Sequence, residues 1–292
     1  MKTSLGLLRS LPFALTGLAL LGSCDTSRQG TDAATNAASS ANSPVGGPRT
    51  RPSGDGTLET IEKNGIRLTP FDDSPKFPEA QLRLTSPLPN ANLPSGAVPF
   101  VYELSNFRLT QMTGSQHATQ MANSMKGQHI HNIVDNQPYT AHYDTKFSKP
   151  IADGQHVVLS FLSRSYHESL KHRGAYDVRV LNVGAVRDST FAFNAKAPHL
   201  FYSRPKDTYT GPAETQRVIL DFYLVNATLT PGGTNVRATI NGTEFLLDRW
   251  LPYLMEGLPM GENTVKLELV DASAVLIPGP FNTVTRTFTL QP

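Results

Sequence analysis

One stretch of this chain occurs twice, about a hundred residues apart, and this internal duplication constrains the fold more than any other feature. Residues 127–162 match residues 234–269: Val134-Asp135-Asn136 matches Ile240-Asn241-Gly242, and Gly154 matches Gly261. The same alignment puts Tyr139 opposite Phe245. Two copies need the same residues only where those residues make the fold, so residues found in one copy alone are candidates for function.

Histidines distinguish the first copy from the second. His129 and His131 are opposite Asn235 and Arg237 in the alignment. An insertion, residues 110–126, also belongs to the first copy alone. We therefore expect the functional residues in the first copy.

Short runs of alternating apolar and polar residues, separated by turn residues such as Asp153-Gly154, predict β-strands throughout both copies. The chain has 22 glycines, 22 prolines and no convincing stretch at helical period, which favours an all-β protein. Copies of this length, with strands at this spacing, predict two tandem immunoglobulin-like β-sandwich domains. The expected divisions are a signal peptide (1–23), a flexible tether (24–57), a first sandwich (58–190) with the inserted loop 110–126, and a second sandwich (197–292).

The duplication also predicts which side of each strand faces the core. In the second copy the alternation places Val236, Ala238 and Ile240 inside. The equivalent register puts Ile130, Asn132 and Val134 in the first core, and His129, His131 and Ile133 on the outer face of the sheet. The neighbouring outward residues are also apolar: Val157, Leu159 and Phe161. An apolar sheet face has to be covered by the insertion, the other domain or a ligand, and we expect partial cover by the insertion.

The N-terminus has the pattern of a bacterial lipoprotein signal. Lys2 and Arg9 precede the apolar residues 11–21, and Leu21-Gly22-Ser23-Cys24 resembles a lipobox. This pattern predicts cleavage before Cys24 and lipidation of its thiol, which anchors the protein in the cell envelope, facing the periplasm or at the cell surface. No other apolar run reaches the ~18 residues that span a bilayer, so the lipid anchor is the expected membrane contact.

Composition excludes several classes of function. Cleavage would remove Lys2 and Arg9, so that 24 basic residues (26 minus 2) balance 24 acidic ones, which gives no electrostatic case for nucleic acid. Cys24 is the only cysteine, so no disulfide is expected. The chain has no GxSxG, HExxH or glycine-rich phosphate loop, so we expect no enzyme and assign no catalytic residue.

Four longer motifs resemble a known family. They are ANSMKGQHIH (122–131), NQPYTAHY (136–143), FLSRSYHESLK (161–171) and APHLFYSRP (197–205). They resemble a family of Bacteroidota envelope lipoproteins labelled "phosphopeptide-binding protein", and the resemblance extends from about Gly65 to the C-terminus. It implies that the partner is a peptide, a protein or another anionic ligand.

Residues 164–173, RSYHESLKHR, combine three fixed cations with histidines and hydroxyl groups. Phosphate sites use bidentate arginine, lysine and short hydroxyl donors, whereas the matching second-copy loop, 270–280, has no cation. The alternative is a solvated loop after a strand. The predicted anion-binding residues are Arg164, Ser165, His167, Lys171 and Arg204.

His129 and His131 are two residues apart on a predicted strand, so their side chains point the same way and can chelate zinc or copper. The third ligand could be His117, His142 or His167, and we name His142 with the pair. Methionines 112, 121 and 125 could serve a cuprous ion. The alternative is that the histidines only form hydrogen bonds to the inserted loop.

The sequence therefore predicts a non-catalytic, lipid-anchored binding protein without a required cofactor. Recognition of an anionic ligand by the first domain is the first hypothesis, and zinc or copper binding is the second. A structural or adhesive role is the third. A third histidine within reach of both His129 and His131 would favour metal. Convergence of Arg164, Lys171 and Arg204 in one concavity would favour an anion.

Overall fold

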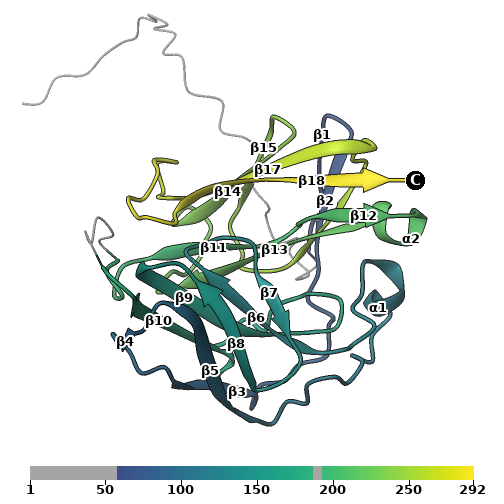
Figure 1. The fold of residues 1–292 in the computed structure, drawn as a ribbon. Coiled ribbons are helices and arrows are strands. Elements are labelled where there is room, and N and C mark those ends of the chain that lie inside the picture. Colours follow the sequence, from purple (N-terminus) through teal and green to yellow (C-terminus); the bar gives the residue numbers. More distant parts are fainter. Residues whose placement is uncertain (1–57, 187–192) are drawn as a thin grey trace, which may run out of the picture. The chain divides into compact units, whose positions relative to one another are not determined.

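Four β-sheets make up the described part of the chain, residues 58–186 and 193–292 of a computed structural model. These residues form an all-β fold, as predicted, with only short helical turns at α1 (His117–Gln120), α2 (Pro212–Thr215) and η1 (Arg173–Ala175). Figure 1 shows the sheets in sequence colours. The predicted signal peptide (1–23), Cys24 and the tether (24–57) lie outside the described residues. Within those residues, no helix is both long enough and apolar enough to span a membrane.

The first sandwich consists of a three-stranded and a five-stranded sheet. The smaller sheet has the order β3 (Gln81–Ser86), β5 (Gly96–Ser105), β8 (Lys146–Ile151). The larger sheet has the order β4 (Asn92–Leu93), β10 (Tyr176–Val183), β9 (Gly154–Ser163), β6 (His129–Val134), β7 (Thr140–His142). Phe100, Ile130 and Leu162 are fully buried between them, where the apolar side chains exclude water.

The second sandwich consists of two five-stranded sheets. The first has the order β1 (Ile61–Lys63), β2 (Ile66–Pro70), β16 (Tyr253–Glu256), β13 (Val218–Val225), β11 (His199–Arg204). The other has the order β12 (Thr208–Thr210), β18 (Thr283–Gln291), β17 (Gly261–Val270), β14 (Asn235–Ile240), β15 (Thr243–Leu247). Strand β2 pairs with β16, so the first residues of the expected first domain, from 58 onward, contribute a hairpin to the second sandwich instead. Local pattern could not show this, because the partner strand lies far along the chain.

Strand order confirms the duplication. The sheet β4-β10-β9-β6-β7 corresponds to β12-β18-β17-β14-β15, and both edge strands, β4 and β12, run parallel to their neighbours. Val134 pairs with Val158 as Ile240 pairs with Val265, and Gly154 and Gly261 begin equivalent strands. The proposed match of Tyr139 with Phe245 is wrong. Phe245 lies in the second core, whereas the longer hairpin loop of the first copy turns Tyr139 to the opposite face.

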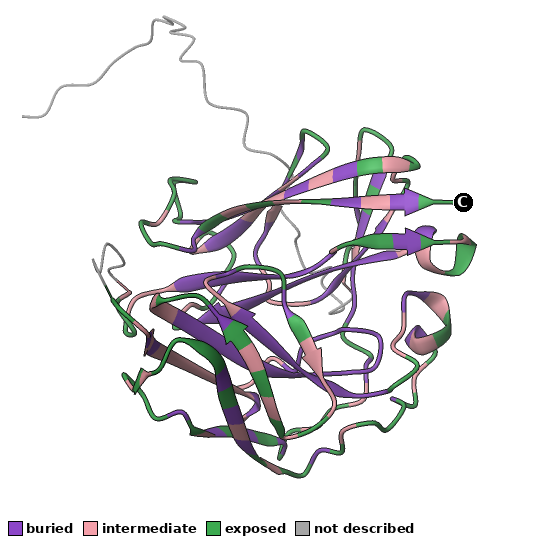
Figure 2. Cartoon of the chain, in the orientation of Figure 1, coloured by how far each residue is buried: buried purple, intermediate pink, exposed green. Residues whose placement is uncertain are grey.

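The apolar outer face of the larger first sheet is covered by the second sandwich. Phe161 of β9 stacks on Tyr223 of β13, with ring centroids 4.6 Å apart, and Phe201 of β11 is in the same cluster. Every residue of β13 is buried, because this strand has a core on each side (Figure 2). The predicted inward and outward faces are confirmed, since Ile130 lies in the core and Ile133 on the outer face.

The inserted loop 110–126 does not provide the main cover of this face. Its backbone is fixed to the turn after β9, where Ser124 N–H donates to the carbonyl of Ser165 at 2.8 Å. Met121 packs with Tyr166 and with Ile219 of β13 in a separate small cluster. The insertion therefore closes one end of the contact between the sandwiches, and the sheet face itself is covered by β11 and β13.

Candidate metal centre

Three histidine side chains of the first sandwich meet in the buried contact between the two sandwiches. They are His129, His131 and His167, and their ligand nitrogens lie within 4.8 Å of one another. His129 Nε2 is 2.9 Å from His131 Nε2 and 3.2 Å from His167 Nδ1. Four-coordinate zinc at 2.0–2.1 Å from each nitrogen requires neighbouring ligand nitrogens ~3.4 Å apart. The two separations from His129 Nε2 are shorter than that spacing by about 0.5 Å and about 0.2 Å.

Two different elements position these ligands. His129 and His131 are alternate residues of β6, so both side chains leave the same face of the sheet. His167 comes from the turn that follows β9, with φ at +68°, in the left-handed region that non-glycine residues rarely adopt. The second copy has the same turn, in which Ala274 has φ +60° and the equivalent backbone hydrogen bonds. The duplicated fold therefore supplies the turn, and the histidine side chain is the addition.

The hydrogen bonds fix the protonation of the central ligand. His129 Nδ1 is 2.8 Å from the carbonyl of Gly127, which can only accept, so Nδ1 carries the proton and Nε2 carries a lone pair. Two further ring nitrogens, from His131 and His167, face this one lone pair. A metal-binding histidine characteristically donates its other ring N–H to a carbonyl in this way, which orients the ring and raises its basicity.

Burial keeps the three rings neutral. His129 and His131 have no exposed surface, and His167 is 8% exposed. Burial lowers the pKa of His129 to about 4. Burial, the neighbouring histidines and the Arg204 charge hold the pKa of His131 and that of His167 well below the usual value. Neutral imidazole is the form that binds metal, so these side chains are competent ligands at neutral pH.

Tyr139 forms one wall of the site. Its ring stacks on His131 with centroids 3.5 Å apart, and its hydroxyl lies 3.3 Å from His167 Nδ1. Burial raises the pKa of the Tyr139 phenol, so the group is a neutral donor. The Arg204 guanidinium lies 5.3 Å from the centroid of the same ring.

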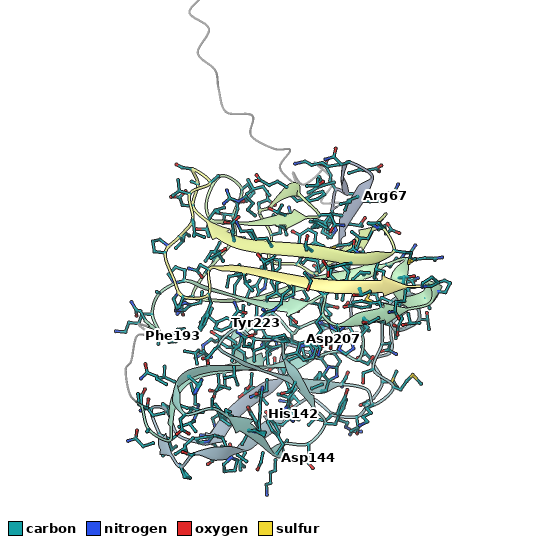
Figure 3. All side chains as sticks on the ribbon, turned by 45° about the horizontal axis from the view of Figure 1, so that its top comes forward. Arg67, His142, Asp144, Phe193, Asp207 and Tyr223 are labelled. Carbon is teal, nitrogen blue, oxygen red and sulfur yellow. The ribbon has the colours of Figure 1, made fainter. Side chains whose placement is uncertain are left out.

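The third histidine is His167, which was one of the three candidates for the third ligand as well as a predicted anion-binding residue, and not His142. His142 stacks on Phe147 with centroids 3.3 Å apart, and its Nε2 is 2.8 Å from Thr140 Oγ1. Figure 3 shows His142 on the strands of the first sandwich, whereas Tyr223 lies where the sandwiches meet. Register explains the error, because His142 pairs with Ile130 and so shares the orientation of a core residue.

The other proposed metal ligands are also elsewhere. His117 lies on α1 with its Nε2 2.7 Å from Asp73 Oδ1. Met121 is packed in an apolar cluster, whereas Met112 and Met125 are exposed. Among the described residues, the group of three histidines is the cluster with metal-ligand spacing.

Arg164 and Lys171, predicted to bind an anion, are already neutralised. Arg164 Nη1 is 3.0 Å from Glu168 Oε1, and Arg164 Nη2 donates to the carbonyl of Pro75 at 2.7 Å. Lys171 forms an ion pair with Asp221, a fully buried residue of β13. Arg164 is bonded to the segment around Pro75, and Lys171 is paired with the second sandwich. The charges of both side chains are therefore not free for a ligand.

The remaining predicted anion-binding residues have different roles and lie in different parts of the structure. Ser165 exchanges hydrogen bonds with Thr113: its N–H donates to Thr113 Oγ1 and its Oγ accepts from Thr113 N–H, which anchors the insertion. Arg204 lines a cavity of about 210 Å³ together with His167. Arg164 and Lys171 line a different cavity of about 420 Å³. The structure does not bring Arg164, Lys171 and Arg204 into one concavity.

Sequence reasoning missed Tyr139 as part of the site, because its alignment with Phe245 suggested a core role. The available indication was the longer loop between β6 and β7, which changes which side of the hairpin the residue faces. The role of His167 could have been inferred from the alignment of the two copies, because Ala274 occupies the equivalent position in the second copy.

No family model matches the chain, and a search of curated proteins found no match. The resemblance to Bacteroidota envelope lipoproteins therefore stays a prediction.

Several solved structures are similar to this chain at low identity. The fibronectin(III)-like modules of Clostridium thermocellum CbhA align over 72% of this chain and 94% of that chain, with 8% identity and a TM-score of 0.25. Bacteroides ovatus SGBP-B, in complex with a mixed-linkage heptasaccharide, aligns over 72% of this chain and 47% of that chain, with 8% identity and a TM-score of 0.22. The central fibronectin-III array of RIM-binding protein aligns over 73% and 68%, with 10% identity and a TM-score of 0.23. Because these TM-scores are low, the sandwich assignment rests on the sheets and their register.

Proposed function

We propose that this protein is a non-catalytic metal-binding protein that holds one zinc or copper ion through His129, His131 and His167. The observation that carries the proposal is the meeting of three neutral, buried ring nitrogens at metal-ligand spacing. Three imidazoles suit zinc or copper and leave a fourth coordination position open.

A purely structural histidine cluster accounts less well for the geometry. One lone pair, on His129 Nε2, can accept one well-formed hydrogen bond, yet two other ring nitrogens approach it within 3.2 Å. Each neutral ring has one N–H, so either His131 or His167 can donate to this lone pair but not both, and further protonation is opposed by burial. A bound cation would satisfy all three nitrogens together.

Metal content measures this proposal directly. The full chain, purified without chelator and titrated with zinc and copper, is expected to bind one ion per chain. The variant His129→Asn with His167→Ala introduces the residues of the second copy and should bind none, because one histidine cannot hold the ion. His142→Ala is the matched control and should bind like the original chain. Equal metal content in the double variant and the control would contradict the proposal.

An envelope location for this activity follows from the predicted lipidation of Cys24. Acyl chains on this residue would hold the protein at the membrane while the two sandwiches stay outside the bilayer. Cys24→Ser should move the protein from the membrane fraction to the soluble fraction. Persistence of the variant in membranes after a high-salt wash would contradict the anchor.

A further inference from the structure

A second cavity adjoins the histidines and contains an unpaired buried charge. It has a volume of about 210 Å³, and its lining includes His167, Arg204, Lys206, Tyr209 and Asn123. This volume is large enough for a small oxyanion. Because His167 lines the cavity, a ligand inside it would lie next to the metal centre.

Arg204 has no carboxylate within ion-pair distance among the described residues, although it is only 8% exposed. Its Nη1 donates to Tyr209 Oη at 3.0 Å, but its buried Nε has no hydrogen-bond partner. A buried charge is costly unless it is paired and hydrogen-bonded. An anion in the cavity would supply both the opposite charge and an acceptor for Nε.

The orientation of Arg204 is fixed by aromatic rings. Its guanidinium lies over Tyr139 and over Tyr209, at 5.3 Å and 5.8 Å from the ring centroids. Such contacts hold the planar donor fork in one direction, as bidentate recognition of an oxyanion requires. Tyr139 contacts both Arg204 and His131, so one aromatic ring links the donor fork to the histidine group.

The other charges of the cavity lie nearer the solvent. Lys206 Nζ is 2.6 Å from Asp207 Oδ2, and the Asp207 side chain is 70% exposed. Glu214 Oε2 accepts a hydrogen bond from Thr210 N–H at 3.1 Å. These carboxylates are engaged at the rim, and Arg204 is the cation whose charge remains unpaired inside.

We propose that this cavity binds a small oxyanion, a phosphate or carboxylate group, which Arg204 holds and which occupies the open coordination position of the metal. The inference rests on the proposed metal centre. It gives the site a ligand class: a metal ion and an anion bound together, each offsetting the charge that the other brings into a buried space.

The first copy of the fold suggests the substitution for a test. A bulge follows Tyr202 on β11 and Leu84 on β3, so Arg204 and Ser86 occupy equivalent positions. Arg204→Ser therefore places a residue that this backbone already accepts. Arg83→Ser is the matched control, because Arg83 is an exposed arginine that pairs with Glu103 away from the cavity.

The experiment loads the full chain with Co²⁺, whose visible spectrum reports its ligands, and titrates inorganic phosphate or acetate. Phosphate should change the spectrum, and Arg204→Ser should weaken its binding about tenfold or more, with cobalt still bound at one per chain. Arg83→Ser should behave like the original chain. A response to acetate alone would identify a carboxylate ligand.

The two proposals fail in different ways. Bound cobalt with a spectrum that neither anion changes would overturn the anion site and leave the metal centre standing. Absence of cobalt binding would overturn the metal centre. Calorimetry of the metal-free chain with phosphate and acetate would then show whether the cavity binds an anion. Anion binding that Arg204→Ser removes would support the site, and equal or absent binding in both chains would overturn it.

Discussion

Apart from the β1–β2 hairpin added to the second, the two copies have the same strand order, but they use opposite sheets for contact. On the outer face of β3 and β5 in the first copy, Arg83 pairs with Glu103 and both are exposed. At the equivalent position of the second copy, Phe201 pairs with Tyr223 and both are buried against the first sandwich. The same backbone position therefore holds a solvated ion pair in one copy and an aromatic contact in the other.

In the larger sheets the two copies are reversed: the first copy has the buried pair and the second copy has the ion pair. His131 pairs with Phe161 in the first copy, and both are fully buried under the second sandwich. At the equivalent position of the second copy, Arg237 pairs with Glu268 and forms an ion pair of 2.9 Å. After duplication, each copy has one apolar outer face, and the two faces are complementary. The histidine cluster lies on the apolar outer face of the first copy, where its ligands are shielded from water.

Exchanging the residues at one equivalent position would test this comparison with the largest effect. Tyr223→Glu introduces the residue of the first copy, and burying an unpaired carboxylate should lower the free energy of unfolding by about 3–5 kcal/mol. The reciprocal change, Glu103→Tyr, alters an exposed side chain and should cost less than ~1 kcal/mol. Chemical denaturation of both variants measures the difference. Similar losses in the two would show that the contact between the sandwiches contributes little to stability.

A smaller effect is expected from pH. The folded chain holds its three clustered histidines neutral, with the pKa of His129 lowered to about 4, whereas unfolded histidines titrate near ~6.5. The unfolded state therefore binds more protons between these values, so the stability of the metal-free protein should fall as pH drops from about 6.5 to about 4.

The double variant His129→Asn with His167→Ala should lose less stability over the same interval, because two of the titrating groups are gone. Thermal unfolding at several pH values measures both chains. Metal affinity of the original chain should persist below pH 6.5, because burial keeps the three histidine rings neutral there. Parallel pH profiles for the two chains would show that these histidines do not carry the effect.

The sequence was sufficient for the all-β class and the repeated strands, because these depend on local alternation and on the repeat, but not for the place of the β1–β2 hairpin in the second sandwich. The inward and outward faces of β6 followed from aligning Val134 with Ile240, and that alignment also put His129 and His131 together on the outer face. Arg164 and Lys171 were misjudged for a physical reason. A charge run looks available in a sequence, but its partners here, Glu168 and Asp221, are found only when the chain has folded.

What the sequence determined by itself was the all-β class, the duplicated topology and the pair of histidines on one strand, since each of these follows from periodicity along the chain. Only the tertiary structure decided that the second sandwich covers the histidines and that His167 completes the group. The same holds for the unpaired Arg204 charge beside them. Burial, neutral protonation and ligand spacing come from contacts between residues far apart in sequence, and no local pattern encodes those distances.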